Sequence, residues 1–183
     1  MISDRDYSIT FECVENGLKI YYNPVHVLTN NPEFPMQMFN LNNYMSLTRE
    51  EPETRFAEGF DFYKYSRGMG ALGMPGDLSS MSRFVRTSFT RLNSVCGETE
   101  SESVSQFFHI LNSVAQTRGC VRVEDSFEIT SYSSCCNTDK GVYYYKTYDN
   151  SQISAVDLHR ENLDRNGLII YNLVNEQQVN YQN

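Results

Sequence analysis

Several features that define common protein classes are missing from this chain of 183 residues. Its longest apolar runs, such as 167–171, cover only a few residues, whereas a membrane helix needs about 20. No basic stretch followed by an apolar one marks a secretory signal. Because hydrophobic residues still make up 40% and charged residues 21%, we expect a folded, soluble protein with no membrane segment.

Positive charge is also scarce. The chain carries 15 Lys and Arg against 23 Asp and Glu, which gives a net charge of -8. It contains no Lys- or Arg-rich run, and a net negative field repels a phosphate backbone. The composition therefore argues against binding to nucleic acid.

Cysteine is present without a metal or disulfide pattern. The count is odd and no C-x-x-C spacing occurs, which disfavours both a zinc ribbon and a disulfide scaffold. We expect reduced, mostly buried thiols in a cytoplasmic protein. Strand alternation is expected to send Cys135 and Cys136 to opposite faces, in preference to a vicinal redox pair. The other cysteines are Cys13, Cys96 and Cys120.

Short motifs typical of metal sites and serine nucleophiles are absent, and a motif typical of nucleotide sites occurs without the strand and helix that it requires. His26, His109 and His159 are far apart and form no H-E-x-x-H, and there is no G-x-S-x-G. Residues 68–73 match G-x-G-x-x-G, but a polar stretch precedes them and Met74-Pro75-Gly76 follows before any helix. We therefore predict no metal, no nucleotide and no other cofactor.

The order of secondary structure predicts an α+β fold with antiparallel sheets. Asn16-Gly17 between two β-rich runs indicates a hairpin, and Pro32 places Asn30 and Asn31 at a strand end or loop. Apolar spacing favours helices at about 34–47, 79–95 and 102–116. Residues 50–75 lack periodicity and are expected to form a long loop or arm. Strands are expected at 8–14, 18–22, 127–134, 141–148, 152–159 and 168–173.

Two polar residues are candidates for a catalytic site, each with an ordinary alternative. Arg83 lies in the first turns of a predicted helix, where an ordinary surface arginine is the default interpretation. A fixed guanidinium can, however, lower the pKa of a nearby thiol. Asn30 precedes a proline-containing turn, and asparagine is common at such positions simply because it favours turns. Its carboxamide can also donate to a developing oxyanion.

Longer segments carry a resemblance to a known family. Leu28-Thr29-Asn30-Asn31-Pro32 and Leu72-Gly73-Met74-Pro75-Gly76-Asp77 are two of them. Further matching segments are residues 39–44, 82–84, 106–111, 141–145 and 147–150. Together they resemble the choloylglycine hydrolases, the family of bile salt hydrolases and penicillin V acylases, along nearly the whole chain.

The resemblance implies a partial N-terminal-nucleophile (Ntn) hydrolase fold, an αββα sandwich of antiparallel sheets and helices. It implies that Asn30 helps to hold the oxyanion and that Arg83 lies close to the nucleophilic sulfur. It also implies that residues 43–75 form an arm that joins subunits into a homotetramer. The substrate of the complete enzyme would be a conjugated bile acid, and no cofactor is implied.

The same resemblance places a further stretch before Met1, which supplies the N-terminal cysteine nucleophile. None of the five cysteines here can replace it, because each lacks a free α-amine. We therefore expect residues 1–183 to be a single incomplete domain, the C-terminal part of a bile salt hydrolase. Alone it should be inactive, and it should aggregate or need a complementing fragment.

Two alternatives stay open at this point. The first is a fragment of a penicillin V acylase, since the residues that discriminate the two substrates lie mainly outside this chain. The second is a non-catalytic module that associates with itself through residues 43–75.

Overall fold

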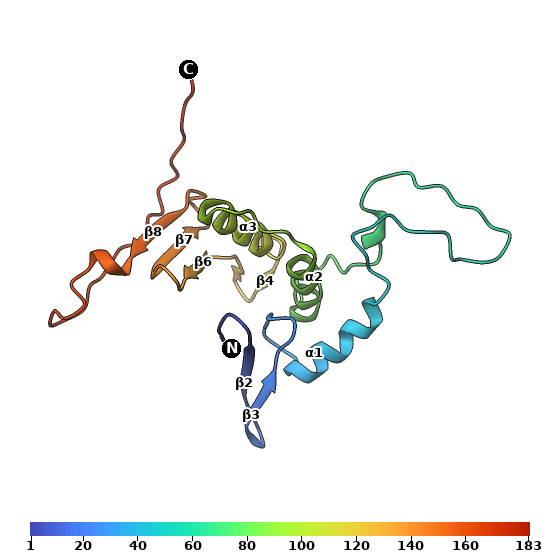
Figure 1. The fold of residues 1–183 in the computed structure, drawn as a ribbon, viewed down its shortest axis with the longest axis horizontal. Helices are drawn as coiled ribbons and strands as arrows, with labels where there is room; N and C mark the ends of the chain where they lie inside the picture. The colour runs from blue at the N-terminus through green and yellow to red at the C-terminus, as the bar shows by residue number, and fades with distance from the viewer. The chain divides into compact units, whose positions relative to one another are not determined.

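A computed structural model describes residues 1–183 as two compact units, residues 1–94 and residues 95–183 (Figure 1). Each unit combines an antiparallel sheet with helices, so the predicted α+β class is confirmed. None of the helices is long and apolar enough to cross a bilayer. The single incomplete domain expected from the resemblance stays a prediction.

The first unit begins with the predicted hairpin. Strands β1 (Ile2–Ser3), β2 (Ser8–Val14) and β3 (Gly17–Tyr22) form an antiparallel sheet in that order. Gly17 takes a φ of 102°, a left-handed conformation that only glycine adopts at little cost. The prediction of a turn at Asn16-Gly17 is therefore confirmed. The two strands that it joins pair from Val14 opposite Gly17 to Ile9 opposite Tyr22.

Two helices complete the first unit. Helix α1 (Phe34–Asn40) has a proline in its first turn, and α2 (Ser80–Asn93) is capped by the Ser79 side chain. The core between them consists of Val25, Val27, Phe34 and Phe84. Phe34 and Phe84 meet edge to face with ring centroids 6.2 Å apart. Because Phe34 of α1 packs on Phe84 of α2, the loop that precedes α1 is held against α2.

The helix predicted at 34–47 is shorter than expected. It ends at Asn40 and continues as a 3₁₀ turn, η1 (Leu41–Tyr44). Asn42 Nδ2 donates to the carbonyl of Phe39 at 2.7 Å, and Asn43 Nδ2 donates to Asn40 Oδ1. Asparagine side chains that bond locally in this way compete with the helical backbone, which explains the early end.

The residues between η1 and α2 form the predicted arm. Beyond its short 3₁₀ turn, η2 (Met69–Ala71), the segment contains no helix or strand and forms the long open loop seen in Figure 1. The base is closed by a hydrogen bond from Thr48 N to Gly70 O. A Cβ on Gly70 would lie 2.0 Å from the Glu50 carbonyl oxygen, so the closure requires glycine there.

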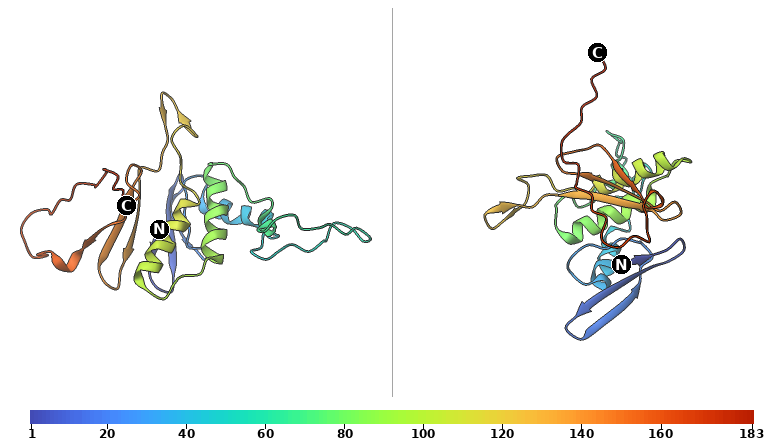
Figure 2. Two further views of the ribbon diagram at one scale, coloured as in Figure 1. Left: turned by 90° about the horizontal axis from the view of Figure 1, so that it is seen from above. Right: turned by 90° about the vertical axis from the view of Figure 1, so that its left-hand side faces the viewer.

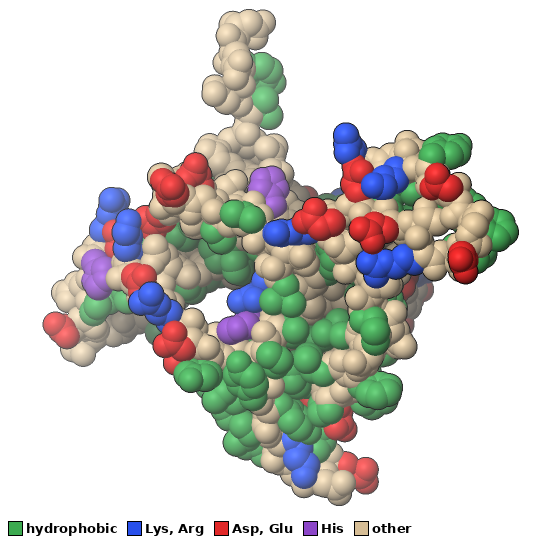
Figure 3. Space-filling model, turned by 45° about the vertical axis from the view of Figure 1, so that its right-hand side comes forward, with side chains coloured by type: hydrophobic (Ala, Val, Ile, Leu, Met, Phe, Trp, Pro, Cys, Tyr) green, Lys and Arg blue, Asp and Glu red, His purple; other side chains and the backbone are tan.

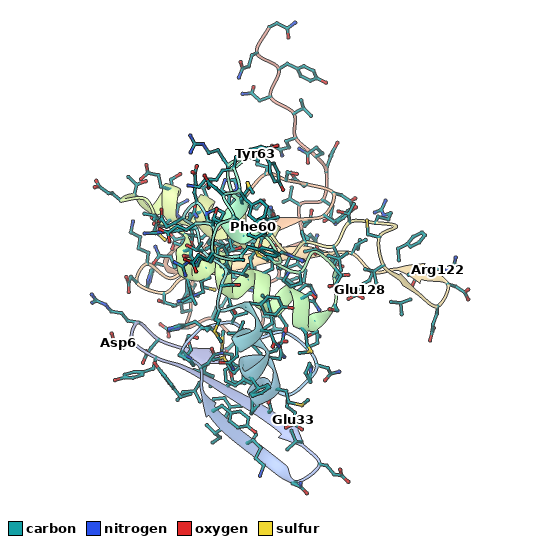
Figure 4. The ribbon with its side chains drawn as sticks, turned by 90° about the vertical axis from the view of Figure 1, so that its right-hand side faces the viewer. Asp6, Glu33, Phe60, Tyr63, Arg122 and Glu128 are labelled. Atoms are coloured by element: carbon teal, nitrogen blue, oxygen red, sulfur yellow. The ribbon has the colours of Figure 1, made fainter.

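The second unit pairs one helix with a meander. Helix α3 (Glu100–Asn112) has a capping box, and β6 (Tyr132–Asn137), β7 (Val142–Thr147) and β8 (Ser154–Asp157) form an antiparallel sheet. The 3₁₀ turn η3 (Leu158–Arg160) follows β8. A separate ribbon of β4 (Arg122–Val123) and β5 (Ser126–Phe127) projects from this unit in both views of Figure 2. Figure 4 labels Arg122 and Glu128 on the ribbon and its base.

Several predicted boundaries in the second unit are wrong. The helix expected at 102–116 starts at Glu100, because the Thr99 side chain caps it there. It ends at Asn112, and Gln116 instead forms hydrogen bonds with Thr130. The strand expected at 127–134 is split between β5 and β6. Residues 168–173 form no strand, because a β-rich run needs a ladder partner and none pairs with it.

The expectation of mostly buried cysteines is also wrong. Four of the five free thiols are exposed, and only Cys135 is half-buried. Burial raises the pKa of the Cys135 thiol, with a smaller contribution from neighbouring Cys136. The adjacent pair does follow strand alternation, since Cys135 lies opposite Tyr144 and Cys136 opposite Tyr143.

Glu100 ties α3 to the meander. Its carboxylate accepts hydrogen bonds from Lys140 Nζ at 2.6 Å, Asn137 Nδ2 at 2.5 Å and Tyr144 OH at 3.0 Å. These bonds, that of Lys140 first, hold the pKa of Glu100 below its ordinary value of 4.5. A depressed carboxyl pKa stabilises the folded state at neutral pH, and this contribution is lost as the pH falls below that ordinary value.

We expect Glu100→Ala to loosen α3, because three donors lose their shared acceptor. Hydrogen exchange in the full chain should be faster across α3 at pH 7, and the difference from the parent chain should shrink below about pH 4. Glu98→Ala, which removes an exposed carboxylate outside the helix, is the control. Equal protection of α3 in both variants would contradict this role.

Candidate functional site

Asn30 and Arg83 meet in the first unit although 53 residues separate them. Arg83 Nη2 donates to Asn30 Oδ1 at 2.8 Å. Asn30 lies in the loop before α1 and Arg83 in the first turns of α2, so the contact is made by the loop and helix that the core brings together. The two sequence candidates therefore belong to one local arrangement.

Arg83 keeps an uncompensated positive charge. Its backbone is fixed within α2, and its Nε donates to the carbonyl of Leu78 at 3.1 Å. No carboxylate forms a salt bridge with it, whereas seven such pairs occur elsewhere in the chain. A half-buried guanidinium held by two neutral acceptors remains able to attract a nearby anion.

The contact with Arg83 also orients the carboxamide of Asn30. Because Oδ1 accepts the bond from the guanidinium, Nδ2 of Asn30 is left as a donor with no acceptor in the chain. Asn30 is exposed, so this N–H group faces outward from the unit. The pair thus presents one cation and one neutral donor side by side, a combination that suits an anion and a developing oxyanion.

Gln37 clamps the loop that carries Asn30. Its side chain on α1 is fully buried, and its Nε2 donates to the Pro32 carbonyl at 2.7 Å and to the Asn30 carbonyl at 3.4 Å. Its Oε1 accepts from Thr29 Oγ1 at 2.6 Å, and Thr29 Oγ1 in turn accepts from Ser80 Oγ of α2. The loop is therefore held to both helices on either side of Asn30.

Asp77 organises the start of α2, six residues before Arg83. Its carboxylate accepts from Ser79 N at 2.9 Å and from Ser82 Oγ at 2.5 Å. Bonds from Ser79 and then Ser82 lower the pKa of Asp77 to about 2. Sequence reasoning did not identify the role of Gln37. A buried glutamine on a helix does not contribute to the apolar spacing from which buried positions are predicted.

The remaining sequence motifs lie outside this arrangement. His26 is half-buried and its Nδ1 shares a hydrogen bond with Ser8 Oγ, and burial lowers the pKa of His26. His109 and His159 are exposed. The glycines of 68–73 surround the turn η2, with no strand before them and α2 beginning only at Ser80. Neither Asn30 nor Arg83 hydrogen bonds to any cysteine of the chain.

Comparison with known proteins shows the family to which the chain belongs. The model of the linear amide C-N hydrolases, choloylglycine hydrolase family, matches residues 1–171. The chain belongs to that family. It is 60% identical to a bile salt hydrolase/transferase of Lactiplantibacillus plantarum over 97% of this chain and 55% of the relative. It is 39% identical to a bile salt hydrolase/transferase of Clostridium perfringens over 100% of this chain and 56% of the relative.

Solved structures agree with the family assignment. A mutant of conjugated bile acid hydrolase from C. perfringens matches with a TM-score of 0.86 and 36% identity, over 97% of this chain and 54% of that one. Penicillin V acylase from Agrobacterium tumefaciens matches with a TM-score of 0.61 and 19% identity, which shows the fold alone. The predicted Ntn hydrolase fold is thus confirmed. The chain spans about half the length of the relatives it matches.

The low pKa of Asp77 gives a direct test of the α2 start. A depressed carboxyl pKa stabilises the folded state above the ordinary value of 3.8, and this contribution disappears as the pH falls from there toward about 2. A carboxyl NMR titration of the full chain should place Asp77 near pH 2, and Ser82→Ala should raise it. Ser101→Ala at the start of α3 should leave it unchanged. A midpoint for Asp77 at its ordinary value in the parent chain would contradict the assignment.

Proposed function

We propose that this chain is the C-terminal part of a bile salt hydrolase, which cleaves the amide joining a bile acid to glycine or taurine. The nucleophile would be an N-terminal cysteine from the part of the enzyme that this chain does not span. The family assignment and the relatives named as bile salt hydrolases support this reaction. The observation that carries the proposal is the contact between Asn30 and the unpaired Arg83.

The proposed reaction proceeds through two acyl transfers. The thiolate attacks the amide carbonyl carbon and forms a C–S bond, while the carbonyl electrons move to the oxygen. Collapse breaks the C–N bond, and the amine nitrogen leaves as glycine or taurine after taking a proton from the enzyme's general acid. Water then attacks the thioester carbonyl, which releases the bile acid carboxylate and returns the thiol.

Each of the two residues has a defined part in that scheme. The guanidinium of Arg83 stabilises the thiolate by lowering the pKa of the thiol, without changing its own charge. The free Nδ2 of Asn30 donates to the tetrahedral oxyanion, and removal of one such donor from an enzyme costs about 3 kcal/mol. The clamp by Gln37 keeps this donor in place before the substrate arrives.

The two alternatives have weaker support. The likeness to penicillin V acylase is at 19% identity and carries the fold only, whereas the matches at 60% and 39% identity are to bile salt hydrolases. A purely non-catalytic module would not need an uncompensated guanidinium beside an oriented amide donor. A cytoplasmic location is also proposed, because five free thiols suit a reducing compartment.

Self-association through residues 43–75 is proposed as part of the complete enzyme. Phe56, Phe60 and Phe62 of the arm form a cluster with ring centroids 5.6 to 6.3 Å apart, yet Phe56 is 79% exposed. Figure 4 labels Phe60 and Tyr63 on this loop. Elsewhere on the arm, Glu51 forms ion pairs with Lys64 and Arg67. A preformed aromatic cluster open to solvent suits a contact with another subunit.

The proposed activity is tested with a fusion protein. We expect the isolated chain to release no glycine from glycocholate, because it lacks the nucleophile. When the part of the L. plantarum relative that lies outside the match precedes this chain, turnover of glycocholate should appear and should exceed turnover of penicillin V. Glycine release by the isolated chain, or a folded fusion that hydrolyses neither substrate, would contradict the proposal.

Variants of the fusion assign the two residues. Asn30→Ala should lower kcat by about 10²- to 10³-fold with little change in KM, as for other oxyanion donors. Arg83→Met should lower kcat/KM and shift the acid limb of its pH profile to higher pH, because the thiol pKa rises. Arg91→Met removes the same charge two turns further along α2 and should change neither quantity.

The arm is tested in the same fusion protein. Replacing Phe56, Phe60 and Phe62 by serine should convert a tetramer into smaller species, because the exposed apolar cluster is removed. Light scattering after size exclusion measures the mass. Asp61→Ser, a polar change on the same loop, is the control. A triple variant that stays tetrameric would rule out this contact.

A further inference from the structure

The hydroxyl of Thr29 lies where the loop of Asn30 meets both helices of the first unit. Thr29 is half-buried and directly precedes Asn30. Its Oγ1 lies 2.6 Å from Gln37 Oε1 of α1, 3.0 Å from Ser80 Oγ of α2 and 3.1 Å from the carbonyl oxygen of Ser80. One hydroxyl therefore contacts both of the helices that flank the proposed site.

The other bonds of Gln37 decide how the Thr29 hydroxyl is oriented. Gln37 Nε2 donates to two carbonyls of the loop, those of Asn30 and Pro32. Oε1 is therefore the end of the amide that faces Thr29, and an amide oxygen can only accept. The hydrogen of Thr29 goes to Gln37, and its oxygen accepts from Ser80 Oγ. Donation thus runs in one direction, from Ser80 through Thr29 to Gln37 and then to the loop carbonyls.

This chain of bonds and the contact between Asn30 and Arg83 form one closed circuit. Ser80 is the first residue of α2, and Arg83 follows in the same first turns. Asn30 bonds to Arg83 through its side chain and to Gln37 through its backbone carbonyl. Thr29 joins the same two helices a second time, one residue earlier. Without its hydroxyl, Gln37 Oε1 and Ser80 Oγ both lose the partner that links them.

The surroundings offer few substitutes for a lost hydrogen bond. Leu28 in the same loop packs against the core that contains Phe34 and Phe84. On the surface of this unit, hydrophobic side chains gather over the part where the β2–β3 hairpin and α1 lie (Figure 3). Gln37 is fully buried, so its Oε1 would be left without a donor if the hydroxyl were removed. Removal of the hydroxyl is therefore expected to shift the loop.

We propose that Thr29 is a positioning residue for the oxyanion donor, because its hydroxyl joins α1 and α2 through the loop and so fixes where Nδ2 of Asn30 points. Thr29 does not touch the reacting atoms in this scheme and acts through Asn30. A donor contributes most when it is already aimed before the reaction begins. The effect on catalysis rests on the proposed function, whereas the hold on the loop can be measured without turnover.

The chain offers a matched set of variants for the fusion protein. Thr29→Val keeps the shape of the side chain and removes the hydroxyl, while Thr29→Ser keeps the hydroxyl. We expect Thr29→Val to lower kcat by about tenfold or more with little change in KM, and Thr29→Ser to retain most of the activity. Thr87→Val is the control, because Oγ1 of Thr87 on α2 is buried and has no hydrogen-bond partner. It should behave like the parent protein.

A double variant shows whether Thr29 acts through Asn30. In a fusion that already carries Asn30→Ala the donor is absent, so Thr29→Val should lower kcat by less than about twofold further. A side chain that served only folding would lower kcat by the same factor in both backgrounds. The comparison therefore separates a positioning role from a structural one.

Hydrogen exchange separates this inference from the proposed function. Peptides covering 27–34 of the fusion should exchange faster in Thr29→Val than in the parent or in Thr29→Ser, while peptides of α3 should be unchanged. A parent fusion without turnover would contradict the proposed function, and the exchange of 27–34 would still decide whether the hydroxyl holds the loop.

Three results would overturn the role of Thr29. Thr29→Val could exchange like the parent over 27–34 or keep the parent kcat in an active fusion. Its effect on kcat could be undiminished beside Asn30→Ala. Exchange could also rise across the whole chain, in which case the hydroxyl would serve the fold in general and not the position of the donor.

Discussion

The hydrogen bond between Arg83 and Asn30 is the contact on which the rest of this account depends. It determines which end of the Asn30 carboxamide remains a donor, and it leaves the guanidinium charge without a carboxylate partner. The surrounding structure holds the two ends of this contact. Gln37 fixes the loop of Asn30, and Asp77 fixes the first turn of α2. Fixed donors and charges of this kind do not have to reorganise when a reaction begins.

In the proposed reaction, this chain would position the cation and the oxyanion donor, and a cysteine outside residues 1–183 would be the nucleophile. Residues 1–94 hold a cation and a donor in place through a small core and a buried amide clamp. The β2–β3 hairpin of the same unit carries Leu18, Ile20 and Tyr22 on one face, and each of these side chains is exposed. No free thiol of the chain hydrogen bonds to this pair, although the proposed reaction requires a reactive sulfur. The proposed reaction therefore needs a sulfur other than the five thiols of this chain.

Local signals predicted much of this fold from the sequence. Asn16-Gly17 located the hairpin, the apolar spacing located α2 to within two residues at either end, and strand alternation separated Cys135 from Cys136. The failures have physical causes. Residues 168–173 have β propensity but no ladder partner, and local asparagine bonds shortened the helix from Phe34. Asn30 and Arg83 were candidates from the sequence, and the structure shows that they are in contact. Gln37 was not a candidate, because a side chain that holds a loop through tertiary hydrogen bonds produces no periodic pattern in the sequence.

The most direct measurement is a crystal structure of the chain joined to the part of the fold that it does not span, with a bound product or substrate analogue. If Arg83 and Asn30 act as proposed, the nucleophilic sulfur lies within about 4–6 Å of the Arg83 guanidinium, the range over which a charge lowers a thiol pKa. In that case Nδ2 of Asn30 also points at the carbonyl oxygen of the analogue. A sulfur that lies elsewhere, with Asn30 and Arg83 bonded only to each other and away from the ligand, would contradict the account.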